Sequence, residues 1–129
     1  LHLSLRRQRQ MCIRDSIRSH GLKTGMVLKV DTPVERVKPF LPQLDFVTLL
    51  GTAIGVKGQG LDPSATTRLQ EAKAFIAETG RRIILAADGG IRENTVPDLR
   101  KAGAETVVLG SLAFGAPDLA ARMAWLKAL

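Results

Sequence analysis

One acidic residue in this chain interrupts an apolar run at a point where packing alone would not require it. The stretch "IILAADGGI" (residues 83–91) begins as a strand suited to a dry interior, and Asp88 ends that strand. Gly89 and Gly90 follow directly, and residues without a Cβ let backbone N–H groups approach an anion closely. The stretch therefore predicts an anion-binding turn that begins with a fixed carboxylate.

Glycine marks two further strand ends. Gly51 ends "DFVTLLG" and opens the loop "TAIGVKGQGLD", which contains Gly58 and Gln59, whereas Gly110 and Ser111 end the last apolar strand. Each feature has a simpler explanation when taken singly, because glycine is common in turns and "GVKGQG" lacks the spacing of a P-loop. Their recurrence at three successive strand ends favours a shared binding site.

Alternating strands and helices must position these residues. Apolar runs predict strands over residues 25–30, 45–51, 82–88 and 105–111, and periodicity with capping signals predicts helices over 31–41, 63–80, 92–104 and 116–129. The first helix is expected to begin with a capping box, with Thr32 as N-cap, Pro33 at the first position and Glu35 three residues after the cap. Gly80 is expected to end the second helix as its C-cap.

The order of these elements predicts an α/β fold with a parallel sheet. The strands are continuous apolar runs, which are typical of a sheet buried on both faces. An open doubly wound sheet and part of a (β/α)8 barrel both fit this order, although a whole barrel needs eight units and about 250 residues. If these are the last four strands of a barrel, "DGG" follows the seventh and "GS" the eighth, where barrels often bind phosphate.

Composition excludes several classes of protein. The 129 residues fit one domain, no apolar run reaches the roughly 18 residues of a membrane span, and the single cysteine, Cys12, cannot form an internal disulfide. The net charge of +7 is concentrated in residues 1–18, which hold five arginines and one acid, so the remainder does not indicate a nucleic-acid partner. His20 lies at an expected helix C-terminus, where a capping role is favoured over metal binding.

Residues 1–16, "LHLSLRRQRQMCIRDS", differ from the rest of the chain. They lack the apolar segment of a signal peptide, and an arginine-rich transit-like segment or the end of a helix would also fit. Because "MCIRDS" resembles translated sequencing-adaptor sequence, we expect residues 1–16 to be an artefactual or disordered basic leader. Residues 17–129 then form the folded part, a C-terminal half-barrel.

From about Ile17 to Leu129 the chain resembles the C-terminal half of the ribulose-phosphate 3-epimerases, a family of (β/α)8 barrels. The matching stretches are "IRSHGLKTGMVLKVDTPVE", a "G-x-x-G-Q-x-x-x-P" pattern that includes Gly58 and Gln59, "ADGGI", "AGAETVVLGSLAF" and "DLAARMAWL". The resemblance implies four β/α units, the C-terminal half of a phosphate-binding (β/α)8 TIM barrel. It further implies a fragment of an enzyme that interconverts D-ribulose 5-phosphate and D-xylulose 5-phosphate.

The resemblance also implies roles for residues at the strand ends. Asp88 would be both a ligand of a divalent metal cation (Zn, Fe, Mn or Co) and one of two acid/base residues for proton transfer at C3. The substrate phosphate would be bound by Gly58, Gln59, Gly89, Gly90, Gly110 and Ser111. The remaining metal ligands are expected in a missing N-terminal half, because no "H-x-x-D" or "H-x-E" stretch occurs here.

The loop after the second strand departs from the family pattern. Ile54, Val56 and Lys57 stand where a proline-glycine-aromatic-glycine-glycine stretch is usual. An epimerase of another ketose phosphate, of the allulose 6-phosphate type, and a non-catalytic sugar-phosphate-binding half-barrel therefore stay as alternatives. We expect a cytoplasmic enzyme without nucleic-acid or membrane partners that is a homo-oligomer at full length. The fragment alone is expected to be inactive and to aggregate or pair with another half.

Overall fold

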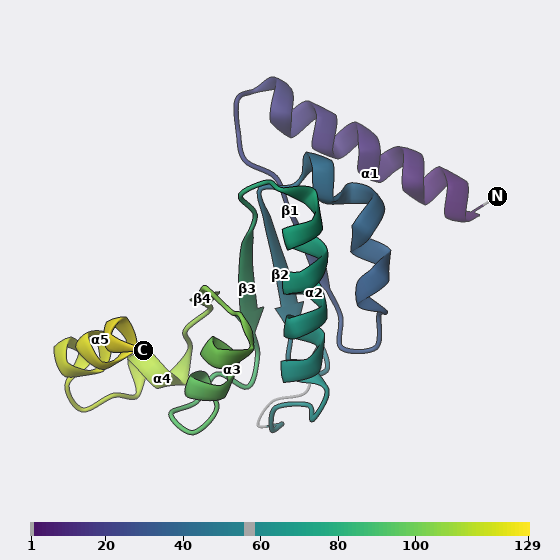
Figure 1. The fold of residues 1–129 in the computed structure, drawn as a ribbon. Helices are drawn as coiled ribbons and strands as arrows, with labels where there is room; N and C mark the ends of the chain where they lie inside the picture. The colour runs from purple at the N-terminus through teal and green to yellow at the C-terminus, as the bar shows by residue number, and fades with distance from the viewer. Residues whose placement is uncertain (1, 56–58) are drawn as a thin grey trace.

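The computed structural model describes residues 2–55 and 59–129 (Figure 1). Its elements follow in the order α1 (His2–Ser19), β1 (Gly25–Leu28), η1 (Val34–Gln43), β2 (Phe46–Leu50), α2 (Ala65–Thr79), β3 (Ile84–Asp88), α3 (Val96–Ala102), β4 (Thr106–Val107), α4 (Ser111–Phe114) and α5 (Leu119–Ala128). Each predicted strand contains an observed strand, so strands and helices alternate as the sequence predicts.

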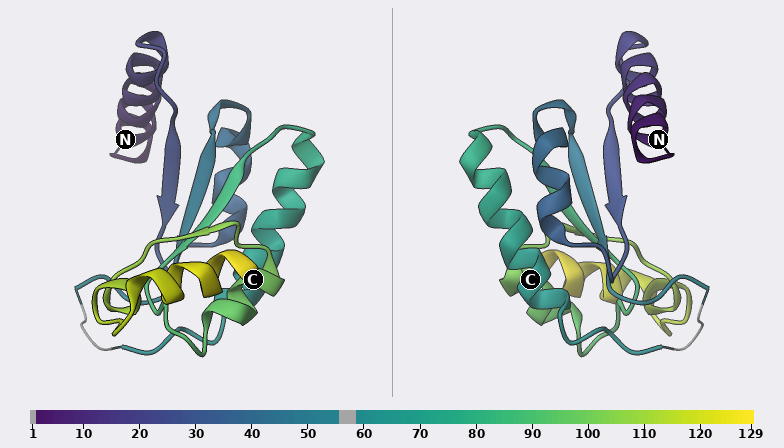
Figure 2. Two further views of the ribbon diagram at one scale, coloured as in Figure 1. Left: turned by 90° about the vertical axis from the view of Figure 1, so that its left-hand side faces the viewer. Right: turned by 90° about the vertical axis from the view of Figure 1, so that its right-hand side faces the viewer.

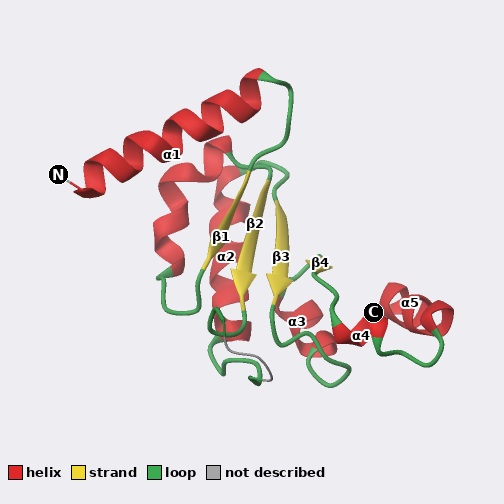
Figure 3. Cartoon of the chain, turned by 180° about the vertical axis from the view of Figure 1, so that it is seen from behind, coloured by secondary structure: helices red, strands yellow, loops and turns green. Residues whose placement is uncertain are grey.

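The four strands form one parallel sheet in the order β1-β2-β3-β4. Helical elements connect β1 to β2, β2 to β3 and β3 to β4, which is the repeating unit of a (β/α)8 barrel. The predicted fold class, four β/α units of such a barrel, is therefore confirmed. Because β1, β2 and β3 run in one direction, their carboxyl ends meet at one edge of the sheet (Figure 3).

The two faces of the sheet have different surroundings. Val47 and Leu49 of β2 are buried, whereas Phe46 of the same strand is 38% exposed. Likewise, Leu28 of β1 is buried and its neighbour Val27 is 59% exposed. Helices η1 and α2 lie on one side of the strands (Figure 2). The prediction of a sheet buried on both faces is wrong for this chain, because four strands do not enclose an interior.

The core lies between the sheet and the helices η1, α2 and α3. Its largest fully buried apolar side chains are Val37, Leu41, Leu44, Val47, Leu69, Ile83, Leu85 and Leu99. In α2, Leu69 and Ala72 are buried at positions i and i+3, as the helical periodicity predicts. Gly80 follows α2 with a φ of +67°, so its predicted role as a C-cap is confirmed.

The connection between β1 and β2 differs from its prediction. Helix η1 is a 3-10 helix, and Pro33 precedes it in an extended conformation without a side-chain cap. The capping box predicted for Thr32 and Glu35 therefore does not form. Pro39 and Pro42 lie inside the helix, and proline has no N–H group to donate to a carbonyl one turn earlier. A regular α-helix is consequently disfavoured here.

The last unit is less regular than the sequence predicts. Strand β4 pairs with β3 over two residues, and helix α4 begins at Ser111, where a strand was expected. Helix α5 begins at Leu119 because the Asp118 side chain accepts a hydrogen bond from the N–H of Ala121 at 3.1 Å. The described residues of α5 include none that is fully buried.

The N-terminal segment is helical. Helix α1 covers most of residues 1–16, so the structure shows a helix where a disordered leader was expected. His20 follows α1, and its Nδ1 donates a hydrogen bond to the carbonyl of Ser16 at 2.7 Å, which confirms the predicted capping role. The adaptor origin of residues 1–16 stays a prediction. Within residues 2–55 and 59–129, no helix has both the length and the apolar character needed to cross a membrane.

Two arginines attach α1 to the rest of the molecule. Arg14 is buried, and its guanidinium lies 4.5 Å from the centroid of the Phe40 ring, close enough for a cation–π contact. Arg18 donates a hydrogen bond to the Gln43 carbonyl at 2.7 Å. Helix α1 is therefore held against the end of η1.

Replacing Arg68 with methionine is expected to lower the free energy of unfolding by about 1–3 kcal/mol, as is usual when hydrogen bonds to a charged group are lost. Arg68 lies on α2 and donates to the carbonyls of Thr32 and Lys29 at 2.6 and 2.7 Å, which ties α2 to the loop after β1. Urea denaturation followed by circular dichroism measures this loss.

Arg82→Met is the matched control for Arg68→Met. The Arg82 side chain is 77% exposed and pairs with Glu105 at 2.8 Å, and exposed ion pairs contribute only about 0–1 kcal/mol. Equal losses for the two variants would contradict the role assigned to Arg68.

Candidate functional site

Asp88 lies at the carboxyl end of β3, beside the end of β2. The register places Asp88 opposite Leu50. The Asp88 backbone carbonyl accepts a hydrogen bond from the N–H of Gly51 at 2.7 Å, so the main chain at this point is fixed to the neighbouring strand. The residue is half-buried. The carboxylate therefore extends from a rigid strand end while it keeps access to solvent.

A cavity of about 350 Å³ adjoins this carboxylate. Its described lining residues are Leu50, Thr52, Ala53, Ile54, Gly55, Asp88 and Gly89. Asp88 is the one ionisable side chain among these described residues. The cavity thus combines a single acid with the backbone of two neighbouring strand ends, which is where (β/α)8 barrels place their chemistry.

Gly89 and Gly90 turn the chain sharply after Asp88. Their φ angles are +89° and +70°, in the region that favours glycine. A Cβ on Gly89 would lie 2.6 Å from the Thr52 hydroxyl oxygen, and one on Gly90 would lie 3.0 Å from the Leu61 Cα. Both positions therefore exclude larger residues.

Four backbone N–H groups at the ends of β3 and β4 are available to an anion. They belong to Gly89, Gly90, Gly110 and Ser111, and in the described part of the chain none of them donates a hydrogen bond to another residue. Unused N–H groups of glycines are groups by which proteins can bind phosphate through the main chain.

The structure places Ser111 in a different cavity from Asp88. This cavity, of about 160 Å³, is lined by Ile91, Arg92, Glu93, Ser111, Leu112, Gly115, Ala116 and Arg122. Arg122 pairs with Glu93 at 3.5 Å, and its Nε is buried without a hydrogen-bond partner among the described residues. Neither arginine was predicted from the sequence. Arg122 lies on α5, and no spacing in the sequence relates α5 to the turn after β3.

The loop after β2 is closed at its base. The N–H of Asp62 donates to the Gly51 carbonyl at 2.8 Å, and the Gln59 side-chain oxygen accepts a hydrogen bond from the N–H of Ala53 at 3.0 Å. Gln59 thus holds the loop together in this structure. Gly58, which was expected to bind phosphate, lies outside the described residues.

Asp62 also orders the start of α2. Its carboxylate accepts hydrogen bonds from the Ser64 hydroxyl at 2.5 Å and from the Ser64 N–H at 2.9 Å. These bonds favour the charged form, so they hold the pKa of Asp62 below its ordinary value of 3.8. The carboxylate therefore stays ionised at neutral pH and keeps the end of the loop in place.

The described residues do not fit a metal site. Within the parts of the chain that the structure describes, no three His, Cys, Asp or Glu side chains gather closely enough to hold a metal ion. Asp88 alone supplies a carboxylate to its cavity, and one carboxylate does not bind a catalytic metal with useful affinity.

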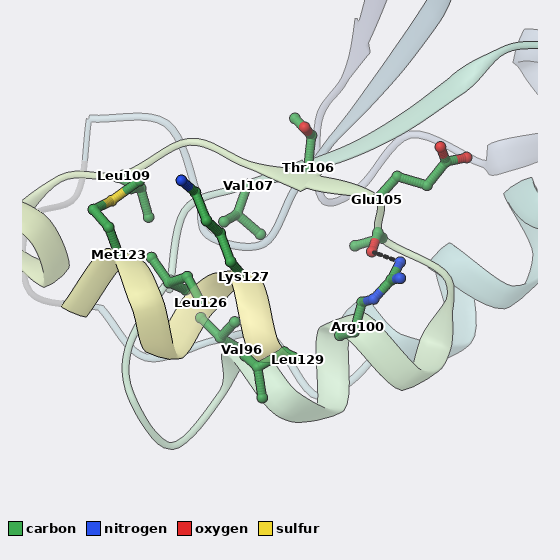
Figure 4. Close-up of a pocket in the computed structure, with 11 residues that line it drawn as sticks. Val96, Arg100, Glu105, Thr106, Val107, Leu109, Met123, Leu126, Lys127 and Leu129 are labelled. Carbon is green, nitrogen blue, oxygen red and sulfur yellow. Dashed lines mark hydrogen bonds between the residues drawn. The ribbon is translucent and has the colours of Figure 1, made fainter. Parts of the chain in front are cut away.

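A further cavity, of about 370 Å³, separates α5 from α3 and β4 (Figure 4). Its walls include Val96 of α3 and Met123 and Leu126 of α5. It does not include Asp88 or Ser111. The cavity reflects the incomplete packing of α5, and it is separate from the strand ends that carry the candidate site.

Four parallel β/α units with an acid and glycine turns at their carboxyl ends define the chain as part of a (β/α)8 barrel with its site at that edge of the sheet. The sequence model of the ribulose-phosphate 3 epimerase family matches residues 1–114. The chain belongs to this family.

Individual relatives agree with this assignment. Ribulose-phosphate 3-epimerase 2 of Cupriavidus necator is 39% identical over 106 residues, which are 79% of this chain and 44% of the relative. The ribulose-phosphate 3-epimerases of Escherichia coli and Bacillus subtilis are each 33% identical, over 45% and 48% of their lengths. The chain therefore spans about half the length of the curated relatives it matches.

One solved structure, a 3-hexulose-6-phosphate synthase, aligns with 90% of this chain and 78% of its own. The sequences are 24% identical and the TM-score is 0.31. This similarity is too low for the geometry of that enzyme to be transferred.

Proposed function

We propose that this chain is part of a ketose-phosphate 3-epimerase that interconverts D-ribulose 5-phosphate and D-xylulose 5-phosphate. The observation that carries the proposal is the Asp88 carboxylate, fixed at a strand end and facing a cavity beside a glycine turn. The family supports the same reaction, because its curated members carry that name. An epimerase of the allulose 6-phosphate type would use the same strand ends and is the alternative.

The chemistry requires a proton to leave one face of C3 and another to arrive on the opposite face. In the proposed mechanism the Asp88 carboxylate takes the C3 proton, and the electrons of the broken C–H bond form an enediolate with the C2 carbonyl. An acid on the opposite face then protonates C3, which inverts the configuration at that carbon. Asp88 is the one acid that lines this cavity among the described residues, so the second group must come from elsewhere.

The phosphate of the substrate would hold C3 against Asp88. The N–H groups of Gly89 and Gly90 after β3, and of Gly110 and Ser111 after β4, which donate to no other described residue, are its proposed donors. Arg122 and Arg92 would add positive charge on the Ser111 side, since both line the cavity that Ser111 occupies. The loop that contains Gln59 would close over the bound sugar and exclude water.

A divalent cation in the complete enzyme would require ligands in addition to Asp88. Such a cation would neutralise the negative charge that develops on the enediolate. A cytoplasmic location and a homo-oligomeric complete enzyme also stay proposals.

Incubation of the complete enzyme, of which this chain is proposed to be part, with D-ribulose 5-phosphate in D₂O tests the proposed function. We expect nuclear magnetic resonance to detect deuterium at C3, and we expect xylulose 5-phosphate as the product. Faster exchange with allulose 6-phosphate would favour the alternative epimerase. Binding of ribulose 5-phosphate without any C3 exchange would instead identify a non-catalytic sugar-phosphate-binding half-barrel.

A further inference from the structure

The cavity beside Asp88 holds a second polar side chain, that of Thr52, which the proposed mechanism does not use. Among the described residues that line this cavity, only Thr52 and Asp88 have side chains that form hydrogen bonds. The other described lining residues are Leu50, Ala53, Ile54, Gly55 and Gly89. Thr52 is half-buried. Its hydroxyl is therefore the one neutral polar group that these side chains present to a ligand beside the carboxylate.

The position of the Thr52 hydroxyl is fixed by the chain around it. Gly51, directly before Thr52, donates its N–H to the Asp88 carbonyl at 2.7 Å and accepts a hydrogen bond from the N–H of Asp62 at 2.8 Å. Threonine is branched at Cβ, which restricts rotation about χ1. The hydroxyl oxygen of Thr52 lies 2.6 Å from the position that a Cβ on Gly89 would take. The hydroxyl is thus held against the first residue of the turn that follows Asp88.

We propose that the Thr52 hydroxyl binds the C4 hydroxyl of the substrate and so contributes to the choice of sugar. The inference rests on the proposed function, which assigns Asp88 to C3 and the N–H groups of Gly89 and Gly90 to the phosphate. Asp88 and the phosphate donors alone would not distinguish sugar phosphates that differ only at C4. Thr52 supplies that distinction.

The place of Thr52 in the site corresponds to the part of the substrate between C3 and the phosphate. Thr52 shares a cavity with Asp88 and lies against Gly89. In a ketose 5-phosphate the phosphate is on C5, so C4 is the one carbon between the reacting centre and the carbon that carries the phosphate. A substrate held at C3 by Asp88 and at its phosphate by the turn therefore brings its C4 hydroxyl to the side chain of Thr52.

A threonine hydroxyl is suited to this contact because it can donate one hydrogen bond and accept two. A sugar hydroxyl has the same capacity, so the hydrogen bond can form in either direction. The contact fixes rotation about the C3–C4 bond, which orients the C3–H bond toward Asp88. Thr52 itself transfers no proton. A substrate that lacks the C4 hydroxyl, or carries it in the opposite configuration, leaves the threonine without this partner and reacts more slowly.

Variants of Thr52 with two substrates test the contact in the complete enzyme, of which this chain is proposed to be part. Thr52→Val keeps the shape of the side chain and removes its hydroxyl. We expect it to lower kcat/KM for D-ribulose 5-phosphate by about 5- to 100-fold, the effect of leaving a hydrogen-bonding group without its partner. Thr52→Ser keeps the hydroxyl and should retain most of the activity. With the 4-deoxy analogue of D-ribulose 5-phosphate, wild type and Thr52→Val should have equal kcat/KM for exchange of the C3 proton, because that substrate lacks the group that Thr52 binds.

Thr48→Val is the matched control, since Thr48 is half-buried on the same strand end of the chain, in β2, and is not among the described residues that line the cavity. It should leave kcat/KM for both substrates unchanged. Equal losses on both substrates in Thr52→Val, or no loss on D-ribulose 5-phosphate, would overturn the inference. Either result leaves the proposed function intact, because the wild-type enzyme still exchanges the C3 proton. A wild-type enzyme that exchanges the C3 proton of neither substrate would overturn the proposed function and the inference together.

Discussion

Replacing Asp88 with asparagine in the complete enzyme is expected to lower the exchange rate of the C3 proton by about 10²–10⁴-fold, the usual contribution of a positioned acid/base group. Asparagine has nearly the same shape, but its amide cannot take a proton from carbon at neutral pH. Asp88 ends β3 and lines the cavity at the strand ends. Deuterium incorporation into ribulose 5-phosphate, followed by nuclear magnetic resonance, measures the change.

The Asp88→Asn variant should keep its fold and its affinity for phosphate. The hydrogen bond from the Gly51 N–H goes to the Asp88 backbone carbonyl, which the substitution does not remove. Glu71→Gln, on the exposed surface of α2, is the control for loss of one negative charge. If both variants exchange the C3 proton at the wild-type rate, Asp88 is not the base.

The features that the sequence predicts well are local ones. The apolar run before Asp88 and the C-cap at Gly80 depend on neighbouring residues, and both are present in the structure. The order of the strands follows from the same runs, because short parallel units place consecutive strands side by side. Asp88 could therefore be assigned to the carboxyl edge of the sheet before its surroundings were known.

The features that the sequence predicts poorly depend on contacts between distant segments. Thr32 and Glu35 have the spacing of a capping box, but Pro33 is extended and the helix after it is 3-10. Arg122 lies beside Ser111 only because α5 turns back toward the end of β3. Likewise, the apolar strands predicted a sheet buried on both faces. The face away from η1 and α2 would be buried only if further strands packed against it, and the pattern within each strand carries no information on such strands.

Gly90→Ala is expected to lower the free energy of unfolding by about 2–5 kcal/mol, the sum of two costs. A left-handed φ costs a residue with a Cβ about 1–2 kcal/mol, and Gly90 has a φ of +70°. Overpacking adds about 1–3 kcal/mol, because the new Cβ would lie 3.0 Å from both the Cα and a methyl carbon of Leu61. Urea denaturation measures the total.

Gly80→Ala separates these two costs. Gly80 has nearly the same φ, +67°, but nothing lies within 4 Å of the position of its Cβ. The Gly80 variant should therefore lose only the backbone cost of about 1–2 kcal/mol. The excess loss in Gly90→Ala measures how tightly the turn after Asp88 packs against the loop before α2. Equal losses would show that this turn is not crowded, and that glycine is required there for its backbone conformation alone. The turn also carries the N–H groups of Gly89 and Gly90, which donate to no other described residue. A crowded turn would therefore lose affinity for inorganic phosphate in Gly90→Ala but not in Gly80→Ala.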